Sequence, residues 1–265
     1  DISFNGYTNV GTINRYTVTN TAEEGNGFNL IGNPYPHRIY KGVAFATTSD
    51  TLAAGYFRLE SDGTWSTQTN STPIEVGEAV FVQASFDGKE GGKLLQFKDR
   101  ASAPAAKYNN DVVEFAVSNS EYEDVTYALF DKGVGLNKIN HRNPEVQMIY
   151  INKDGEDFAI AMMDDATKTF NLNFKAQTTG SYTLSYKTRG EFSYMHVIDR
   201  LTGEDVDMLV EGKYTFIGSP KDNEARFIVR LQYHPDYGEG DDIFPYQNGG
   251  NVIVRGEGEL QVFDV

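Results

Sequence analysis

Apolar residues recur at every second position through much of the chain. Residues 169–177 alternate between apolar and polar side chains, and residues 182–186 and 227–233 do the same. In the first of these segments, Phe170 and Leu172 share one face. Because successive side chains of a strand point to opposite faces, this period of two predicts strands with one buried and one exposed face. Such strands are typical of antiparallel sheets.

Short polar turns separate these strand-like segments. Asp62-Gly63 and Asp154-Gly155 each lie between two apolar runs, and Thr202-Gly203 has the same position further along. Asp and Gly tolerate the positive φ angles that tight hairpins need. The periodicity shows no amphipathic helix longer than about two turns, although residues 131–144 suit a loop with a helical turn. The pattern therefore predicts an all-β protein.

Small, polar and proline-bearing segments suggest how the strands are divided. We expect two tandem antiparallel β-sandwiches of jelly-roll or immunoglobulin-like type, an N-terminal domain at residues 1–103 and a second domain at residues 104–233. Residues 234–250 combine acids with Gly and Pro and cannot supply a core, so they are interpreted as an acidic linker. Residues 251–265 begin a new strand-turn-strand pattern, which suggests the start of a truncated third β-module.

Composition narrows the classes of function. The 265 residues carry a formal net charge of −15, so nucleic acid and anionic lipid are not expected partners. The chain has no cysteine, which excludes disulfides and thiol chemistry without fixing the compartment. No apolar run approaches the ~18 residues of a membrane span, so direct membrane insertion is not expected. The chain begins with Asp1 rather than Met, and we expect a mature protein or a part of a longer one.

The segment "GFNLIGNPYPHRIY" contains two closely spaced prolines. Pro34 and Pro36 fix their own φ angles and push the preceding residues toward extended geometry. This favours a rigid structural corner after an apolar strand. The alternative is a ligand loop built on Asn33, Tyr35 and His37.

One short segment suggests a catalytic pattern. Ser193, His196 and Asp199 suggest a triad, but in a strand His196 would point away from the other two. We therefore expect a sheet-face histidine. Asp164-Asp165 has the setting of a solvated turn rather than of a paired catalytic acid. The sequence predicts no catalytic site and no required cofactor.

One acidic segment near the C-terminal end is a candidate calcium site. Asp236, Glu239, Asp241 and Asp242 lie close together among glycines, and oxygen-rich loops of this kind can hold calcium. Their spacing does not follow the EF-hand pattern. A flexible acidic linker is the alternative interpretation.

Aromatic residues beside a predicted hairpin are candidates for sugar binding. Trp65 is the single tryptophan, and Tyr56 and Phe57 lie on the partner strand. Tyr35 in the proline corner is a further candidate. Exposed flat rings can stack on sugars within a binding cleft. A buried core tryptophan is the alternative, and the exposure of Trp65 decides between them.

Several segments resemble large extracellular proteins of Bacteroidetes. The "GFNLIGNPYP" phrase is similar to their Gly-Trp-Asn-Leu-Ile-Gly-Asn-Pro-Tyr-Pro pattern, with Phe28 in place of Trp. "PIEVGEAVFVQA" is similar to a later strand of these proteins, with Glu78-Ala79 in place of Gln-Gly. A further segment resembles the Leu-x-Asp-x-x-Thr-Gly, Tyr-x-Phe and Arg-Phe pattern that precedes their sorting domains, through Asp199, Thr202, Gly203, Tyr214, Phe216, Arg226 and Phe227.

The last fourteen residues, "VIVRGEGELQVFDV", resemble the first strands of a type IX secretion C-terminal sorting domain. The resemblance implies an extracellular protein or one on the outer-membrane surface of a Gram-negative bacterium, attached in cis to other domains of a longer chain. It implies no activity, because function belongs to sites rather than folds. The preferred interpretation is a non-catalytic surface module, a stalk, spacer or display region. The alternatives are a carbohydrate-binding or adhesin module, with a glycan or a surface protein as partner, and the accessory domains of a secreted hydrolase.

Overall fold

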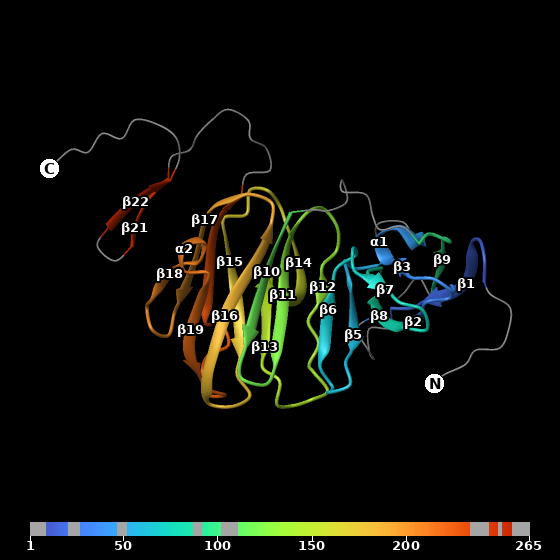
Figure 1. Ribbon diagram of the computed structural model, residues 1–265, viewed down its shortest axis with the longest axis horizontal. Helices are drawn as coiled ribbons and strands as arrows, with labels where there is room; N and C mark the ends of the chain where they lie inside the picture. The colour runs from blue at the N-terminus through green and yellow to red at the C-terminus, as the bar shows by residue number, and fades with distance from the viewer. Residues whose placement is uncertain are drawn as a thin grey trace.

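The computed structural model describes residues 9–20, 27–46, 52–86, 92–101, 111–233, 244–248 and 251–255 (Figure 1). Strands dominate this part of the chain. Its helices are two elements of four residues each, α1 (Lys41–Ala44) and α2 (Met208–Glu211). The predicted all-β class is therefore confirmed. Neither of these described helices is long and apolar enough to cross a bilayer.

Strands β1 to β9 form the first β-region, which contains three small antiparallel sheets of order β1-β9-β4, β2-β8-β5-β6 and β3-β7. In chain order these strands are β1 (Ile13–Val18), β2 (Phe28–Gly32), β3 (Ile39–Tyr40), β4 (Phe45–Ala46), β5 (Tyr56–Leu59), β6 (Trp65–Gln68), β7 (Pro73–Ile74), β8 (Ala79–Gln83) and β9 (Lys93–Phe97). Val18 and Leu95 from one sheet share a core with Ile31 and Val80 from another. Two sheets packed over one core give the sandwich-like arrangement that the alternating pattern predicts.

The second β-region is one continuous sheet of 11 strands, in the order β18-β17-β20-β15-β13-β14-β11-β10-β16-β19 with β12 paired to β14. Its strands are β10 (Asp111–Ser118), β11 (Glu123–Phe130), β12 (Leu136–Asn137), β13 (Met148–Lys153), β14 (Glu156–Met163), β15 (Thr169–Lys175), β16 (Gly180–Arg189), β17 (Phe192–Asp199), β18 (Asp205–Asp207), β19 (Lys213–Gly218) and β20 (Phe227–Tyr233). The sheet rolls up, so that Phe216 on β19 meets Phe227 on β20 with ring centroids 5.1 Å apart.

One strand pair of this region differs from the antiparallel expectation. β11 and β14 run parallel, with Tyr127 opposite Ile160 and Phe130 opposite Met163. Alternation along a strand does not encode the direction of its neighbour, so the sequence pattern could not reveal this pairing.

The predicted turns lie where the sequence placed them. Asp154 and Gly155 join β13 to β14 with φ angles of 55° and 85°. Two successive positive φ angles are those of the hairpin turn that Asp-Gly favours. Asp62-Gly63 lies between β5 and β6, and Thr202-Gly203 lies between β17 and β18. These hairpin predictions are confirmed.

The predicted linker differs in part from the structure. Phe244–Asn248 forms β21 and pairs with β22 (Asn251–Arg255), so the strand-turn-strand pattern begins within residues 234–250 rather than after them. Residues 234–243, including the candidate calcium ligands Asp236, Glu239, Asp241 and Asp242, lie outside the described residues, and so does the predicted domain boundary near residue 103.

A buried ion pair stabilises the rolled sheet near the end of β17. Asp199, at the end of β17, is 0% exposed, and Arg226, just before β20, is 2% exposed. Arg226 Nη2 donates to Asp199 Oδ2 at 2.8 Å, and Tyr214 Oη on β19 donates to the same oxygen at 3.0 Å. Burial alone would raise the pKa of Asp199, but the bonds from Arg226 and from the Leu201 amide hold it below its ordinary value.

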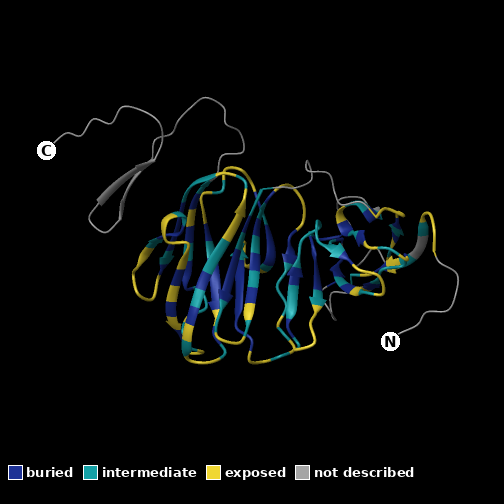
Figure 2. Cartoon of the chain, viewed as in Figure 1, coloured by how far each residue is buried: buried dark blue, intermediate teal, exposed yellow. Residues whose placement is uncertain are grey.

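The two β-regions pack against each other through an apolar contact. Ala53 and Phe57 from the first region share a cluster with Leu136, Ala159 and Ile160 from the second. All five are buried, and Figure 2 shows buried residues along the strand centres of both regions. Burial of these side chains removes apolar surface from water, which favours the docked arrangement.

Polar bonds fix the register of this contact. Gln83 and Asn137 exchange two hydrogen bonds, Nε2 to Oδ1 at 2.9 Å and Asn137 N to Gln83 Oε1 at 3.0 Å. The Ala54 amide donates to the Val134 carbonyl at 2.8 Å. Because such bonds require one relative position, they make the contact specific as well as apolar.

Replacing Arg226 with methionine should leave the Asp199 carboxylate buried without its counter-ion. Breaking a buried pair from one side typically costs about 3–5 kcal/mol, so Arg226→Met should lower the free energy of unfolding by that amount. Arg230→Met, at an exposed position of β20, should change it by less than about 0.5 kcal/mol. Urea denaturation followed by circular dichroism measures both, and equal stabilities would contradict the role given to Arg226.

Substitution of Gly55 by alanine tests how closely the two β-regions pack. Its φ is +66°, and an added Cβ would collide with the Gln68 carbonyl oxygen and with Ile160 Cδ1 across the contact. Gly203 has a similar φ of +79° with nothing within 4 Å of an added Cβ. Both alanine variants carry the backbone strain of about 1–2 kcal/mol, but Gly55→Ala should lose about 1–3 kcal/mol more through overpacking. Thermal unfolding of the two variants measures the difference, and an equal loss would refute the collision.

Candidate functional site

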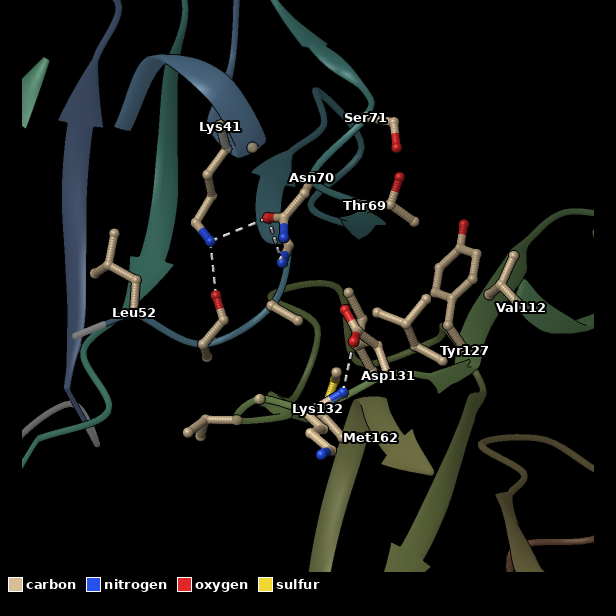
Figure 3. Close-up of a pocket in the computed structure, with 18 of the residues that line it drawn as sticks. Lys41, Leu52, Thr69, Asn70, Ser71, Val112, Tyr127, Asp131, Lys132 and Met162 are labelled. Carbon is tan, nitrogen blue, oxygen red and sulfur yellow. Dashed lines mark hydrogen bonds between the residues drawn. The ribbon is translucent and has the colours of Figure 1, made fainter. Parts of the chain in front are cut away.

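A cleft of about 290 Å³ opens where the two β-regions meet (Figure 3). One wall comes from α1 and from the loops that contain residues 52–55 and 69–71. The other wall comes from β11, β14 and the loop that follows β11 at residues 131–134. Clefts at the junction of two units are a usual place for ligands, so this cleft is the first candidate for a functional site.

Lys41 extends from the start of α1 into a buried position on the first wall. Its residue is 6% exposed, and Nζ donates to the Ala53 carbonyl at 2.6 Å and to Asn70 Oδ1 at 3.1 Å. Asn70 Oδ1 also accepts from the Gly55 amide at 3.0 Å (Figure 3). Asn70 therefore connects the lysine to the loop that contacts the second β-region.

The charge of Lys41 is poorly compensated. Burial lowers the pKa of Lys41 from 10.5 to about 7, because an ammonium ion loses its hydration in the protein interior. The acceptors of its two hydrogen bonds are neutral, and no described carboxylate lies within ion-pair distance of its Nζ. The amine is therefore charged in only part of the population near neutral pH.

The opposite wall carries polar groups around an apolar floor. Tyr127 on β11 faces the cleft. Burial, followed by the charge of Glu114 and the hydrogen bond to it, raises the pKa of the Tyr127 hydroxyl and keeps it neutral. Figure 3 shows the hydroxyl groups of Thr69, Ser71 and Tyr127 directed toward the same part of the cleft. Leu129 supplies part of the apolar floor. The two walls together offer hydroxyl donors and acceptors beside a surface that excludes water.

Basic residues outnumber acidic ones along the cleft. Lys41, Lys132 and Arg189 line it, and Asp131 is the one acid among the described lining residues. The chain as a whole has 38 acidic and 23 basic residues, so the cleft departs from the general charge of the protein. A local excess of positive charge within an acidic surface favours a small anion at this position.

The aromatic residues predicted for sugar stacking lie elsewhere and are packed. Tyr56 is 0% exposed, and its hydroxyl donates to the carbonyls of Thr72 and Pro73 at 3.1 Å. Trp65 is half-buried beside the contact between the regions, with its ring edge-on to Phe81 at 4.9 Å. Burial closes the Tyr56 ring to a sugar, whereas Trp65 keeps part of its surface exposed beside its contact with Phe81.

The proline corner is a structural element. Asn33 Nδ2 donates to the carbonyls of His37 at 2.9 Å and Ile74 at 3.1 Å, while its Oδ1 accepts from the Tyr35 amide. Tyr35 is 2% exposed, and its hydroxyl donates to the Phe97 carbonyl at 3.1 Å. These bonds tie the corner to its own core, as the structural interpretation expected, and leave the Tyr35 ring buried.

The suggested triad is not assembled. His196 is buried on β17, and its Nδ1 lies 2.6 Å from Asp205 Oδ1 on β18. Asp199 is bonded instead to Arg226 and Tyr214. His196 therefore joins two neighbouring strands, as expected for a sheet-face histidine.

A second buried polar cluster lies at the contact between the regions. Lys138 Nζ is 2.7 Å from Asp124 Oδ1, and Asp124 Oδ2 accepts from the Ile149 amide at 2.7 Å. His141 Nε2 is 3.3 Å from Asp124, and its Nδ1 accepts from the Trp65 amide at 3.0 Å. The neutral histidine ring thus bridges the regions, which identifies a structural role.

Across the described residues, no group of three or more His, Asp or Glu side chains is placed to hold a metal ion.

Sequence reasoning missed the cleft because its residues come from distant parts of the chain. Lys41 and Asn70 are 29 positions apart, and Tyr127 belongs to the other β-region. The one local signal is Lys41 itself, which stands in the largely apolar run "RIYKGVAF". A lysine within such a run indicates a buried amine, but nothing in the run indicates what the amine faces.

Comparison with known proteins returned no match. No protein-family model matches the chain, and no curated protein and no solved structure matches it either.

Stability should depend on pH through Lys41. Because its folded-state pKa of about 7 lies below the ordinary 10.5, the unfolded chain binds more protons between these values, and the penalty for burying Lys41 decreases as pH rises. The Lys41→Met variant has no such penalty at any pH. The free energy of unfolding of the variant minus that of the wild type should therefore decrease by up to about 4 kcal/mol from pH ~7 to pH ~10. Urea unfolding measures this, with Lys213→Met on an exposed site as the control. A difference independent of pH would contradict the burial of a charge at Lys41.

Proposed function

We propose that the chain is a non-catalytic module of an exported bacterial surface protein, in which the two β-regions act together as a stiff spacer or display unit. The observation that carries this proposal is the docked contact between the regions. It combines a shared apolar cluster with the reciprocal Gln83–Asn137 bonds and the Trp65–His141 bond. A specific apolar contact of this kind opposes hinge motion, whereas independent domains on a linker would move freely.

The buried titratable groups hold strands together, and this supports the same proposal. Asp199 and Arg226 hold the rolled sheet together, His196 joins β17 to β18, and Asp124 is bonded to Lys138 at the contact between the regions. Groups that are bonded to one another within the fold in this way stabilise a scaffold.

The assignment to the cell surface rests on the sequence. The "GNPYP" corner and the final "VIVRGEGELQVFDV" segment resemble exported proteins of Bacteroidetes and the start of a type IX sorting domain. Fractionation of the bacterium that produces the full-length protein tests this assignment. We expect the protein in the outer-membrane or culture fraction and accessible to added protease. Accumulation in the cytosol would refute export.

Stiffness can be tested by a distance measurement. The chain has no cysteine, so Val76→Cys combined with Lys221→Cys places one spin label on an exposed site of each region. Electron paramagnetic resonance should show a single narrow distribution of distances between the labels. Gly55→Ala should broaden the distribution, because it wedges the contact apart, and Gly203→Ala should not. A broad distribution in the labelled parent protein would show that the regions move independently and would contradict the spacer role.

A further inference from the structure

Lys41 carries an unusual electrostatic cost for a structural residue. A buried ammonium ion is normally paired with a carboxylate, as Lys138 is paired with Asp124 at 2.7 Å in this same protein. Lys41 instead has neutral oxygen partners on Ala53 and Asn70. An ammonium ion has three donors, so one remains after these two bonds. An anion in the cleft would take that donor and supply the missing charge.

The other lining groups restrict the kind of anion. Thr69, Ser71 and Tyr127 present hydroxyl groups, and Leu129 and Ile160 contribute apolar surface. Hydroxyl groups beside an apolar wall are suited to a polyol with one apolar face, which is the surface of a sugar ring. The volume of about 290 Å³ lies at the lower end of ligand pockets, so it fits a single small ring rather than a chain.

We propose that the cleft between the two β-regions binds a monosaccharide that carries a carboxylate, such as a uronic acid. The carboxylate lies against the Lys41 ammonium group, within the positive field to which Lys132 and Arg189 contribute at the cleft. The ring hydroxyl groups bond to Thr69, Ser71 and Tyr127. This role is independent of the spacer function, because a stiff module needs no ligand and a ligand site needs no particular position in the cell.

Affinity for such a ligand should depend on pH through one group. The charged residues among the described lining are Lys41, Asp131, Lys132 and Arg189, and the raised pKa of Tyr127 keeps its hydroxyl neutral. None of the described lining residues is a histidine. Lys41, with a pKa of about 7, changes from mostly charged to mostly neutral in this range. If only the charged form binds the carboxylate, the dissociation constant should rise roughly 30-fold from pH 6 to pH 8.5.

Calorimetric titration of the whole chain with D-glucuronate tests the proposal, and D-glucose is the matched neutral sugar. We expect glucuronate to bind, glucose to bind at least about tenfold more weakly, and affinity to fall at higher salt. Equal affinity for the two sugars would overturn the role of the carboxylate. Binding of inorganic phosphate with no binding of glucuronate, galacturonate or N-acetylneuraminate would overturn the role of the sugar ring. No binding of any of them at millimolar concentration would overturn the site.

Variants locate the ligand. Lys41→Met should abolish the pH dependence and weaken binding at pH ~6 by at least roughly 30-fold, because no charged form remains. Ser71→Ala and Tyr127→Phe remove single hydroxyl groups and should each weaken glucuronate by about 3- to 10-fold. Lys213→Gln, on an exposed site of β19, should leave affinity unchanged. If Lys41→Met fails to fold, the two hydroxyl variants decide, and unchanged affinity in both would place the ligand elsewhere.

Discussion

The docked contact between the two β-regions is the constraint on which the rest of this protein depends. The outer face of the sheet β2-β8-β5-β6 covers β12 and β14, and Phe57, Leu136 and Ile160 lose their exposure to water there. The same contact turns the Trp65 ring inward and creates the cleft at its edge. The packing of Trp65 and the position of the cleft are therefore consequences of one buried apolar surface.

Three buried charged groups show how different environments lead to different roles. Asp199 has Arg226 and Tyr214 as partners, so its ionised form is stabilised and it fastens the sheet. Asp124 is ionised beside Lys138, and it lies next to the histidine that bonds to Trp65. Lys41 has no such counter-charge among the described residues, and its pKa falls for that reason. Asp199 and Asp124 each have a counter-charge, which identifies them as parts of the scaffold. The charge of Lys41 lacks such a partner among the described residues, so an anionic ligand would be stabilising there.

Much of the fold was predictable because it is encoded locally. The period of two placed β15 and β20, and the Asp154-Gly155 pair placed a hairpin through its two positive φ angles. The proline corner was also predictable, because the ring of proline restricts its own residue and the one before it. The candidate site was not predictable, since Trp65 and Tyr56 were chosen for their residue type and not for their exposure. The structure buries Tyr56 and turns Trp65 toward Phe81.

By itself, the sequence determined that this chain folds from strands, where several of its tight turns lie, and that its surface is acidic. These properties depend on neighbouring residues and on composition, which a sequence contains directly. The tertiary structure alone decided that β11 and β14 run parallel, that the two β-regions dock, and that Lys41 shares a cleft with Asn70 and Tyr127. Such relations join residues distant in the chain, and they are set by which apolar faces bury each other.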